Sequence, residues 1–241
     1  MNVVTEDNFT GLLEQHPWAK QFSVLGYADG GSSLIPHRCF RNWLDEEPVD
    51  GHFHIGRCSG LGVGTIAKYD STQQKLVIGR YVSSGLRVRF LLNGQHEIRT
   101  ISSKMLDAFG MAQRPPPQYG DTVVGNDVWI GDEIMVLGGS TIADGCVIGA
   151  RSLVPPNFKS APYGIYAGSP ARLIRYRFSE KIREALLALA WWDMPLAWMR
   201  ANNQHFLVDL THDEGHAMEV LQELMRQKQG AMAAPTSAVL S

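Results

Sequence analysis

The sequence has no long apolar run and few cysteines. No hydrophobic stretch approaches the roughly 18 to 20 residues that cross a bilayer, and the opening MNVVTEDNFTGLLEQHPW carries acidic residues early and lacks the regions of a secretion signal. Three cysteines, Cys39, Cys58 and Cys146, are odd in number and widely spaced, which favours reduced thiols over a disulfide framework. We therefore expect a cytoplasmic protein without a membrane span.

Neither sign of charge is in excess. Lys and Arg number 22 against 24 Asp and Glu, which gives a formal net charge of −2. This balance provides no whole-molecule attraction to nucleic acid or to an anionic membrane, so any anion site must be local. A chain of 241 residues can bury one substantial core and is treated as one domain.

A six-residue period runs through the middle of the chain. Written in sixes from Val124, the sequence reads VGNDVW, IGDEIM, VLGGST, IADGCV and IGARSL, followed by a further V. Neither the 3.6-residue period of a helix nor simple strand alternation produces this pattern. The first position of every hexad is aliphatic, at Val124, Ile130, Val136, Ile142, Ile148 and Val154.

A hexad repeat is typical of a parallel β-helix, in which short strands joined by tight turns stack coil on coil. The first-position aliphatics then form a ladder inside the coil. The second position is often glycine, as in Gly125, Gly131 and Gly149, which suits a turn that needs unusual backbone angles or close approach. The fifth position is never charged and mostly small. Three hexads make one coil, so three to five coils fit between residues 50 and 155.

The same frame recurs upstream, and an insertion separates the two blocks. IGRYVS, SGLRVR and FLLNGQ follow the frame from Ile78, with Ser84 where an aliphatic residue is expected, so this part of the coil should be less regular. The insertion extends from about Gly94 to Thr122 and contains QRPPPQYGD, whose prolines cannot donate ladder hydrogen bonds. Insertions in a solenoid map to loops on one face, often the binding face.

Helical signals follow the repeats. Ser179 is a plausible N-cap, and Ile182, Leu186 and Leu187 begin an apolar stripe. A second amphipathic helix is expected over residues 213–228. We divide the chain into an N-terminal segment that packs on the coil (1–54), the β-helix (55–155) with its inserted loop (94–122), a connecting segment with helices (156–230) and a disordered tail (231–241).

Three stretches in one register carry a family resemblance. VVGNDVWIGDEIMVLGGSTIADGCVIGARSLV, YAGSPARLI and LALAWWDMP, together with NGQH at residues 93–96, resemble the hexapeptide-repeat xenobiotic acetyltransferases, which include type B chloramphenicol and streptogramin acetyltransferases. Residues 1–54 match nothing in that family. The resemblance implies a mainly β, left-handed parallel β-helix with C-terminal helices. It also implies a homotrimer whose three active sites lie between subunits, each receiving the inserted loop of a neighbouring chain.

His96 lies where the family carries its catalytic histidine. Imidazole suits the removal of a proton from an attacking hydroxyl, because its pKa of about 6.5 leaves much of it neutral at pH 7. The alternative is an ordinary polar loop histidine. Either Glu97 or a backbone carbonyl could orient the ring. By resemblance the acetyl group passes directly from acetyl-CoA to the acceptor, so no nucleophilic cysteine or serine is needed.

The acetyl-CoA positions also come from the resemblance. A CoA molecule can lie in the groove between adjacent β-helices, where basic side chains meet its phosphates. The glycines among these positions have an alternative explanation in turn geometry, and the basic residues in a solvated rim. The positions are Trp129, Gly131, Gly139 and Ala150 near the thioester and its arm, Pro170 and Ala171 beside the adenine, and Lys159 and Arg172 at the phosphates.

Two histidine pairs raise the question of a metal. His52 and His54 alternate along a strand, and His212 and His216 have helical spacing, but neither pair has an evident third ligand and HDEGH is not the zinc-protease order. We expect surface histidines and no metal requirement.

The sequence therefore predicts an acetyl-CoA-dependent O-acetyltransferase that acts on a hydroxyl of a small, antibiotic-like molecule, with His96 as general base. The alternatives are an O-acetyltransferase of sugars or polysaccharide precursors, a related enzyme with an amine acceptor or a longer acyl donor, and a non-catalytic trimeric scaffold.

Overall fold

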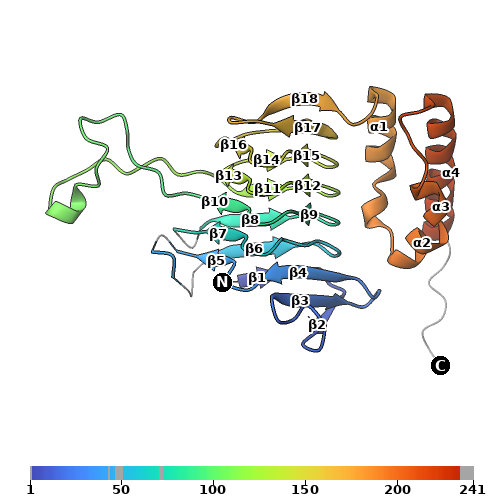
Figure 1. The fold of residues 1–241 in the computed structure, drawn as a ribbon, viewed down its shortest axis with the longest axis horizontal. Helices are drawn as coiled ribbons and strands as arrows, with labels where there is room; N and C mark the ends of the chain where they lie inside the picture. Colours follow the sequence, from blue (N-terminus) through green and yellow to red (C-terminus); the bar gives the residue numbers. More distant parts are fainter. Residues whose placement is uncertain (1, 43, 47–50, 71–72, 234–241) are drawn as a thin grey trace.

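The centre of the molecule is a coil of three parallel sheets, seen in a computed structural model that describes residues 2–42, 44–46, 51–70 and 73–233 (Figure 1). We name the three sheets faces A, B and C in the order in which the chain visits them. Face A contains, from the N-terminal end, β1 (Asn2–Val4), β6 (His52–Ile55), β8 (Lys75–Ile78), β11 (Thr122–Val124) and β14 (Thr141–Ile142).

Faces B and C complete the coil. Face B contains β9 (Ser83–Ser84), β12 (Trp129–Ile130), β15 (Val147–Ile148), β17 (Gly164–Ala167) and β18 (Arg172–Tyr176), of which only β18 runs antiparallel to its neighbour. Face C contains β5 (Phe40–Arg41), β7 (Ile66–Lys68), β10 (Arg89–Leu91), β13 (Met135–Leu137) and β16 (Leu153–Val154).

The stacking register confirms the predicted hexad frame. Val124 pairs with Ile142, and Ile130 pairs with Ile148 on the next face, so three hexads complete one coil. All six first-position aliphatics have an exposed fraction of 0%. The fifth-position side chains are also buried, including Ser140 and Cys146. Burial of this aliphatic ladder is the main stabilising term of the coil, because hydrophobic stabilisation grows with the apolar area removed from water.

The corners of the coil show which of the two alternatives applies to the second-position glycines. Gly131 is needed for close approach, because a Cβ there would lie 2.7 Å from the backbone nitrogen of Ala150. The left-handed backbone angle falls instead on the fourth position of the hexad, where non-glycine residues such as Asp127, Glu133 and Arg151 have φ between 52° and 58°. Of the two alternatives left open for the second position, unusual angles or close approach, the structure shows close approach.

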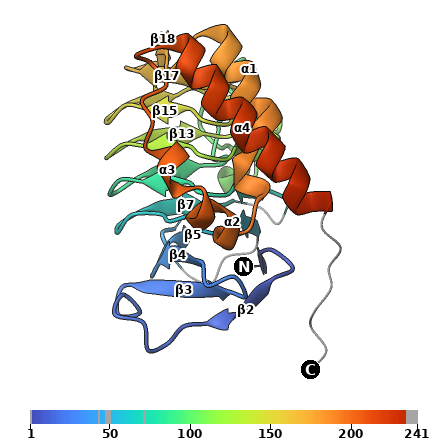
Figure 2. The same ribbon diagram turned by 90° about the vertical axis from the view of Figure 1, so that its right-hand side faces the viewer.

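The N-terminal segment contributes to the coil and also closes its lower end (Figure 2). β1 pairs with β6 and β5 pairs with β7, so two strands from this segment begin faces A and C. The antiparallel strands β2 (Phe9–Leu12), β3 (Phe22–Tyr27) and β4 (Ser32–Pro36) form a separate small sheet, and a bridge from Leu34 to Gly60 joins it to face B.

The C-terminal helices pack beside the coil (Figures 1 and 2). They are α1 (Glu180–Leu189), the 3-10 helix η2 (Trp191–Asp193), α2 (Leu196–Ala201), α3 (Asn203–Phe206) and α4 (Glu214–Ala233). Ser179 caps α1 as predicted, because its side chain accepts a hydrogen bond from the backbone nitrogen of Ile182. α4 extends five residues beyond the predicted end at residue 228, so residues 231–233, assigned to the tail, are helical; residues 234–241 lie outside the described residues.

The insertion projects away from the coil (Figure 1). Between the end of β10 at Leu91 and the start of β11 at Thr122, every residue is described and the only regular element is the 3-10 helix η1 (Asp107–Phe109). Large apolar side chains on this loop face solvent in the single chain; Ile101 is fully exposed. Among the described residues, no helix is long and apolar enough to cross a membrane.

Candidate active site

His96 lies on the neck of the insertion, just after β10. Its Nδ1 atom is 2.7 Å from the carbonyl oxygen of Ser103, across the base of the loop. A carbonyl oxygen only accepts hydrogen bonds, so this contact requires the proton of the neutral ring to be on Nδ1. The other nitrogen, Nε2, then carries the lone pair. The imidazole is exposed and is held in the tautomer that a general base needs.

Glu97 has a different partner from the one we considered. Its carboxylate accepts hydrogen bonds from the Nε and Nη2 atoms of Arg99 and lies 3.3 Å from Nε of Arg114. These hydrogen bonds from Arg99, together with the two positive charges, lower the pKa of the Glu97 carboxyl to about 2. Arg114 lies on the returning segment of the insertion. Glu97, Arg99 and Arg114, which we call the neck clamp, therefore join the outgoing and returning segments of the loop.

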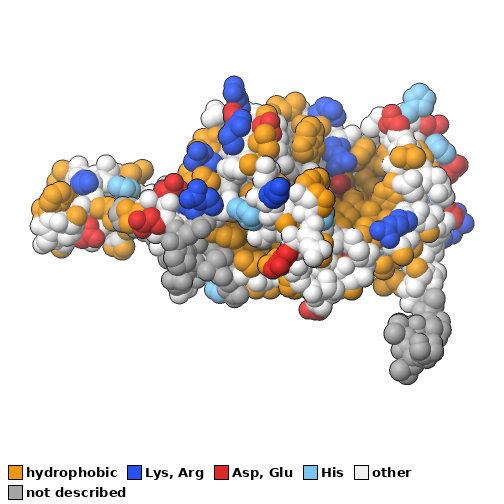
Figure 3. Space-filling view, turned by 60° about the horizontal axis from the view of Figure 1, so that its bottom comes forward, with side chains coloured by type: hydrophobic (Ala, Val, Ile, Leu, Met, Phe, Trp, Pro, Cys, Tyr) orange, Lys and Arg blue, Asp and Glu red, His pale blue; other side chains and the backbone are white. Residues whose placement is uncertain are grey.

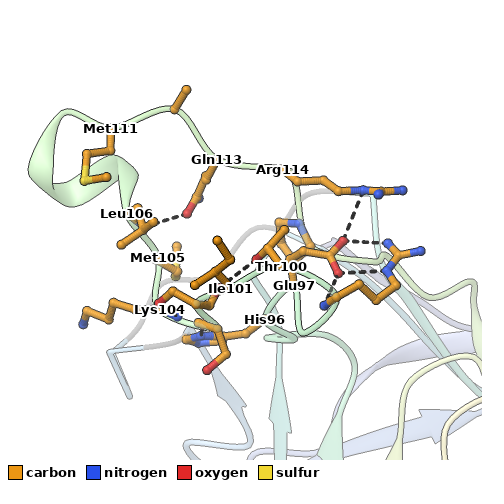
Figure 4. Close-up of a pocket in the computed structure, with 15 residues that line it drawn as sticks. His96, Glu97, Thr100, Ile101, Lys104, Met105, Leu106, Met111, Gln113 and Arg114 are labelled. Carbon is orange, nitrogen blue, oxygen red and sulfur yellow. Dashed lines mark hydrogen bonds and ion pairs between the residues drawn. The ribbon is translucent and has the colours of Figure 1, made fainter.

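A cavity of about 600 Å³ opens beside these groups (Figure 4). His96 and the neck clamp line it on the coil side, and Ile101, Met105 and Leu106 line it along the loop. The volume lies within the range of about 300 to 1,000 Å³ that small-molecule sites occupy, and the wall combines apolar side chains with a few convergent polar groups. Such a cavity suits a mostly apolar molecule that presents one hydroxyl to the imidazole.

Most of the predicted donor positions share one edge of the coil, the corner between faces B and C. Trp129 is on β12 and is 59% exposed. Gly131 follows it, and Ala150 stacks directly on Gly131 in the next coil. Residues 168–171 lie on top of this column, because the backbone nitrogen of Leu153 donates to Gly168 and that of Ala171 donates to Leu153.

Pro170, Ala171 and Arg172 complete the B–C corner at its upper end. Ala171 is buried, whereas Pro170 and Arg172 are exposed. The Arg172 guanidinium donates from Nη1 to the carbonyl oxygen of Ala171 at 3.1 Å, and the residue is exposed. Within the part of the chain that the structure describes, no acidic side chain pairs with it.

The remaining predicted positions lie at a different edge, the corner between faces C and A. The insertion begins and ends there, and the backbone nitrogen of Tyr119 donates to Oδ1 of Asn93 at 3.0 Å. Gly139 turns the chain from β13 to β14 at the same corner. Lys159 is exposed and bridges to Thr141 on face A, near the top of the coil.

One chain therefore does not bring its predicted site residues together. His96, Gly139 and Lys159 belong to the C–A corner, whereas Trp129, Ala150 and Arg172 belong to the B–C corner, with face C between them. The two groups could act on one substrate pair only where the C–A corner of one chain faces the B–C corner of another.

Several contacts at the site could not be found from sequence. The carbonyl of Ser103 orients His96, and a backbone carbonyl carries no side-chain signal. Arg114 meets Glu97 only because the loop folds back on itself, seventeen positions along the chain. The one available signal was the alternation of opposite charges at Glu97 and Arg99.

The other reactive side chains lie elsewhere. Cys39 and Cys146 are buried, and burial raises the pKa of the Cys146 thiol, so it is a poor nucleophile. Among the described residues, no three His, Cys, Asp or Glu side chains are grouped so as to hold a metal ion. Burial lowers the pKa of His54 on β6, and His216 lies 3.8 Å from Glu219 on α4.

Comparison with known proteins gives a hexapeptide-repeat family and relatives that are acetyltransferases. The family described as bacterial transferase hexapeptide (six repeats) matches residues 121–156. A chloramphenicol acetyltransferase of Escherichia coli is 41% identical over 180 residues, which cover 64% of this chain and 81% of that protein. A chloramphenicol acetyltransferase of Morganella morganii is 39% identical over 130 residues, 51% of this chain and 61% of that protein.

Solved structures give a looser likeness. A hexapeptide-repeat acetyltransferase from Vibrio cholerae O1 biovar eltor, complexed with acetyl coenzyme A, is 20% identical with a TM-score of 0.36, covering 61% of this chain and 64% of that one. A likeness of this degree supports no inference about the site. The sequence relatives and the hexad frame are sufficient: the chain belongs to the hexapeptide-repeat xenobiotic acetyltransferases.

Proposed function

We propose that this protein transfers the acetyl group of acetyl-CoA to a hydroxyl of an antibiotic-like small molecule, with His96 as general base. The observation that carries the proposal is the 2.7 Å contact between Nδ1 of His96 and the carbonyl oxygen of Ser103, which leaves Nε2 free beside a 600 Å³ cavity. The relatives, which match between 52% and 64% of this chain, include a chloramphenicol acetyltransferase and a probable macrolide acetyltransferase, so an antibiotic-like acceptor is the first class to test.

In the proposed reaction the acceptor oxygen attacks the thioester carbonyl carbon while its proton passes to Nε2 of His96. The carbon–sulfur bond then breaks, the acetyl ester is released, and the imidazolium returns the proton to the departing CoA thiolate. The Ser103 carbonyl stabilises the imidazolium between these two proton transfers, because it accepts the Nδ1 hydrogen bond throughout. The reaction uses no covalent acyl-enzyme and no metal.

The proposed assembly is a homotrimer of left-handed β-helices with three active sites between subunits. Two features of this chain support it. The site residues are divided between the C–A and B–C corners, as an intersubunit site requires. The insertion also exposes apolar side chains, with Ile98 at 78% and Phe109 at 66%, and such side chains favour contact with another surface.

The donor residues fit a long polyanionic molecule laid along the B–C corner. Trp129, Gly131 and Ala150 would meet the thioester and its arm, where the small second-position residues leave the backbone accessible. Pro170 and Ala171 would lie beside the adenine. Arg172 would meet the phosphates from the same chain, while Gly139 and Lys159 would approach from the neighbouring subunit. We also propose a cytoplasmic location, since the reaction needs acetyl-CoA.

The direct test measures thiol release from acetyl-CoA by the purified chain. The acceptor panel contains chloramphenicol, a streptogramin A, a macrolide, simple sugars and nucleotide sugars. We expect turnover with at least one antibiotic and a loss of about a hundredfold or more in kcat/KM on His96→Ala. His212→Ala, at an exposed position that does not line the cavity, is the matched control and should leave turnover unchanged.

The other possible results of the thiol-release assay would change the proposal in different ways. Turnover confined to sugars would replace the acceptor class and keep the mechanism. Near wild-type turnover by His96→Ala would contradict the general base, and no turnover with any acceptor or acyl-CoA would favour the non-catalytic scaffold.

A further inference from the structure

The outer surface of face B has a gap between two large side chains. Successive coils place Leu34, Gly60, Ser83 and Trp129 in one outward column, since Leu34 bridges to Gly60, Gly60 bridges to Ser83, and Ser83 pairs with Trp129. The two residues in the middle of this column are small. A cavity of about 520 Å³, which we call the face B hollow, opens over them. Its volume lies within the range of small-molecule sites.

The fold does not require glycine at position 60. The φ angle of Gly60 is not left-handed, and a Cβ at this position would lie 3.6 Å from the Cβ of Leu34, which is an ordinary van der Waals contact. Gly62, which also lines the hollow, differs because a Cβ there would overlap the carbonyl oxygen of Gly85. Stacking of the coils explains Gly62 but not Gly60. The missing side chain at Gly60 has the effect of lowering the floor of the hollow.

Aromatic side chains of the N-terminal segment form one wall of the hollow. Trp18 and Phe22 line it, and their ring centroids are 6.5 Å apart. Trp18 is 56% exposed, but its turn is fixed, because its carbonyl oxygen accepts hydrogen bonds of 3.0 Å from the backbone nitrogens of Gln21 and Phe22. An exposed tryptophan on a fixed turn offers a large flat contact surface at a low cost in conformational entropy.

The face B hollow offers no charge to a ligand. None of the described residues that line it is acidic, basic or a histidine. Burial raises the pKa of the Cys58 thiol in its wall, so this group is neutral, and the hydroxyls of Ser59 and Ser84 already bond to the backbone of the coil. An adjoining hollow of about 250 Å³ contains Asp127 and Arg177, which pair with each other. A charged ligand would lose its hydration here without gaining a counterion.

The hollow lies at the level of His96 in the stack of coils. The strands β8, β9 and β10 form the coil that leads to His96, and β9 lines the hollow together with residues of the coils below it. Trp129 and the other proposed donor positions lie in the coils above. Closed rotational symmetry contains no translation along its axis. In a trimer whose coils run parallel to that axis, His96 therefore faces the β9 level of the neighbouring chain.

The insertion would cover the hollow of the neighbouring chain in this assembly. Figure 3 shows hydrophobic side chains on the insertion where it projects from the coil. These side chains would close the hollow from outside, while Trp18 and the floor at Gly60 bound it from inside. The donor would then reach His96 from above, and the space below His96 would be left for the acceptor.

We propose that the face B hollow receives an uncharged planar ring of the acceptor, and that Trp18 is a specificity-determining residue. This inference rests on the proposed acetyltransferase function and on the proposed trimer. It narrows the acceptor class to hydroxyl compounds that carry an uncharged aromatic or other planar ring, as chloramphenicol does, and it disfavours sugars.

Binding is tested with two probes of matched shape, 4-nitrobenzyl alcohol and 4-(hydroxymethyl)benzoate, whose nitro and carboxylate groups differ in charge. Each is titrated into the full chain without acetyl-CoA and followed by NMR or calorimetry. Gly60→Val raises the floor and should abolish binding in the hollow. In that component of binding, we expect the nitro compound to bind about tenfold more tightly than the carboxylate. The restriction is needed because the His96 cavity has basic side chains of its own.

Variants of Trp18 separate a planar contact from a merely apolar one. Trp18→Phe keeps a ring and should leave the affinity for 4-nitrobenzyl alcohol within about twofold, whereas Trp18→Leu should weaken it about fivefold. Leu12→Ala changes an exposed apolar residue of β2 that does not line the hollow, and it should have no effect. Because Trp18 is exposed, its variants decide the result if Gly60→Val fails to fold.

Kinetics connect the hollow to the acceptor. With an acceptor identified by the thiol-release assay, Trp18→Leu should raise the KM for that acceptor about fivefold and leave kcat and the KM for acetyl-CoA within about twofold.

Absence of 4-nitrobenzyl alcohol binding, or binding that survives both Gly60→Val and Trp18→Leu, would overturn the inference. An unchanged acceptor KM in Trp18→Leu, or turnover confined to sugars, would also overturn it. The expected binding in a protein that turns over no acceptor would instead contradict the proposed function.

Discussion

The coil and the insertion are built on opposite principles within one chain. In the coil, each hexad places an aliphatic side chain into a continuous ladder, and the six first-position residues from Val124 to Val154 are all fully buried. The insertion has one short 3-10 helix, exposes much of its apolar surface, and is joined at its neck by the carboxylate of Glu97. The rigid part therefore carries the proposed donor positions, and the loosely packed part carries the proposed base.

A buried charge tests this contrast most strongly. Val136→Asp places a carboxylate in the ladder, where nothing pairs with it, and should destabilise the protein by at least about 4 kcal/mol or prevent folding. Ile101→Asp makes the same kind of change at a fully exposed loop position and should alter the unfolding free energy by less than about 0.5 kcal/mol. Chemical denaturation followed by circular dichroism measures both. Similar losses in the two variants would mean that Ile101 is buried as the coil residues are, either within the chain or against a neighbouring subunit.

Two glycines, one in the coil and one in the insertion, allow a smaller change in stability to be compared between these regions. Gly131→Ala would bring a Cβ to 2.7 Å from the backbone nitrogen of Ala150, and the corner must shift to accept it, at a cost of about 1 to 3 kcal/mol. Gly120→Ala, at the end of the insertion, meets nothing within 4 Å and should leave stability unchanged or slightly raised. The unfolding temperatures of the two variants measure this difference. Equal stability would refute the close stacking of successive corners.

Loss of the neck clamp should have the smallest effect, and the stabilisation that the clamp provides should depend on pH. The folded-state pKa of Glu97, about 2, is lower than its ordinary value of 4.5, so the stabilisation that the ion pairs provide is complete above pH 4.5 and is lost as the pH falls toward 2. Glu97→Gln removes the charge at every pH. We expect it to lower kcat about threefold, with KM for acetyl-CoA unchanged, because His96 is held less firmly.

Hydrogen exchange of residues 95–115 provides a second measure of the clamp. Wild-type protein should exchange slowly at pH 5 and faster at pH 3, after correction for intrinsic rates, while Glu97→Gln should show the faster behaviour at both. A variant as protected as wild type would show that the clamp does not hold the loop.

The structure of the coil could be predicted from the sequence more completely than that of the N-terminal end, and the reason is physical. In the coil, a period of six maps directly onto geometry, so the ladder from Val124 to Val154 could be predicted residue by residue. The left-handed angles escaped prediction, because the fourth position holds residues as different as Asp127, Arg151 and Tyr163. At the N-terminal end, β1 pairs with a strand fifty positions away, and no local pattern indicates such a contact.

At the site, His96 and the donor positions came from the resemblance, and the partners of His96 and Glu97 came only from the folded loop. The exposed apolar side chains of the insertion were also unforeseen, since sequence alone does not say which side of an irregular loop is covered. The division of the site between two corners follows from the β-ladder registers.

The central claim is that one complete site needs the C–A corner of one subunit and the B–C corner of its neighbour. Mixing tests it directly: His96→Ala disables the first corner, and Ala150→Trp, an exposed position, blocks the second. Each homotrimer should be inactive, whereas subunits mixed one to one and reassembled should recover about a quarter of the wild-type rate, because every mixed trimer contains one intact site. Recovery near that value supports the account; no recovery from stable mixed trimers would contradict it.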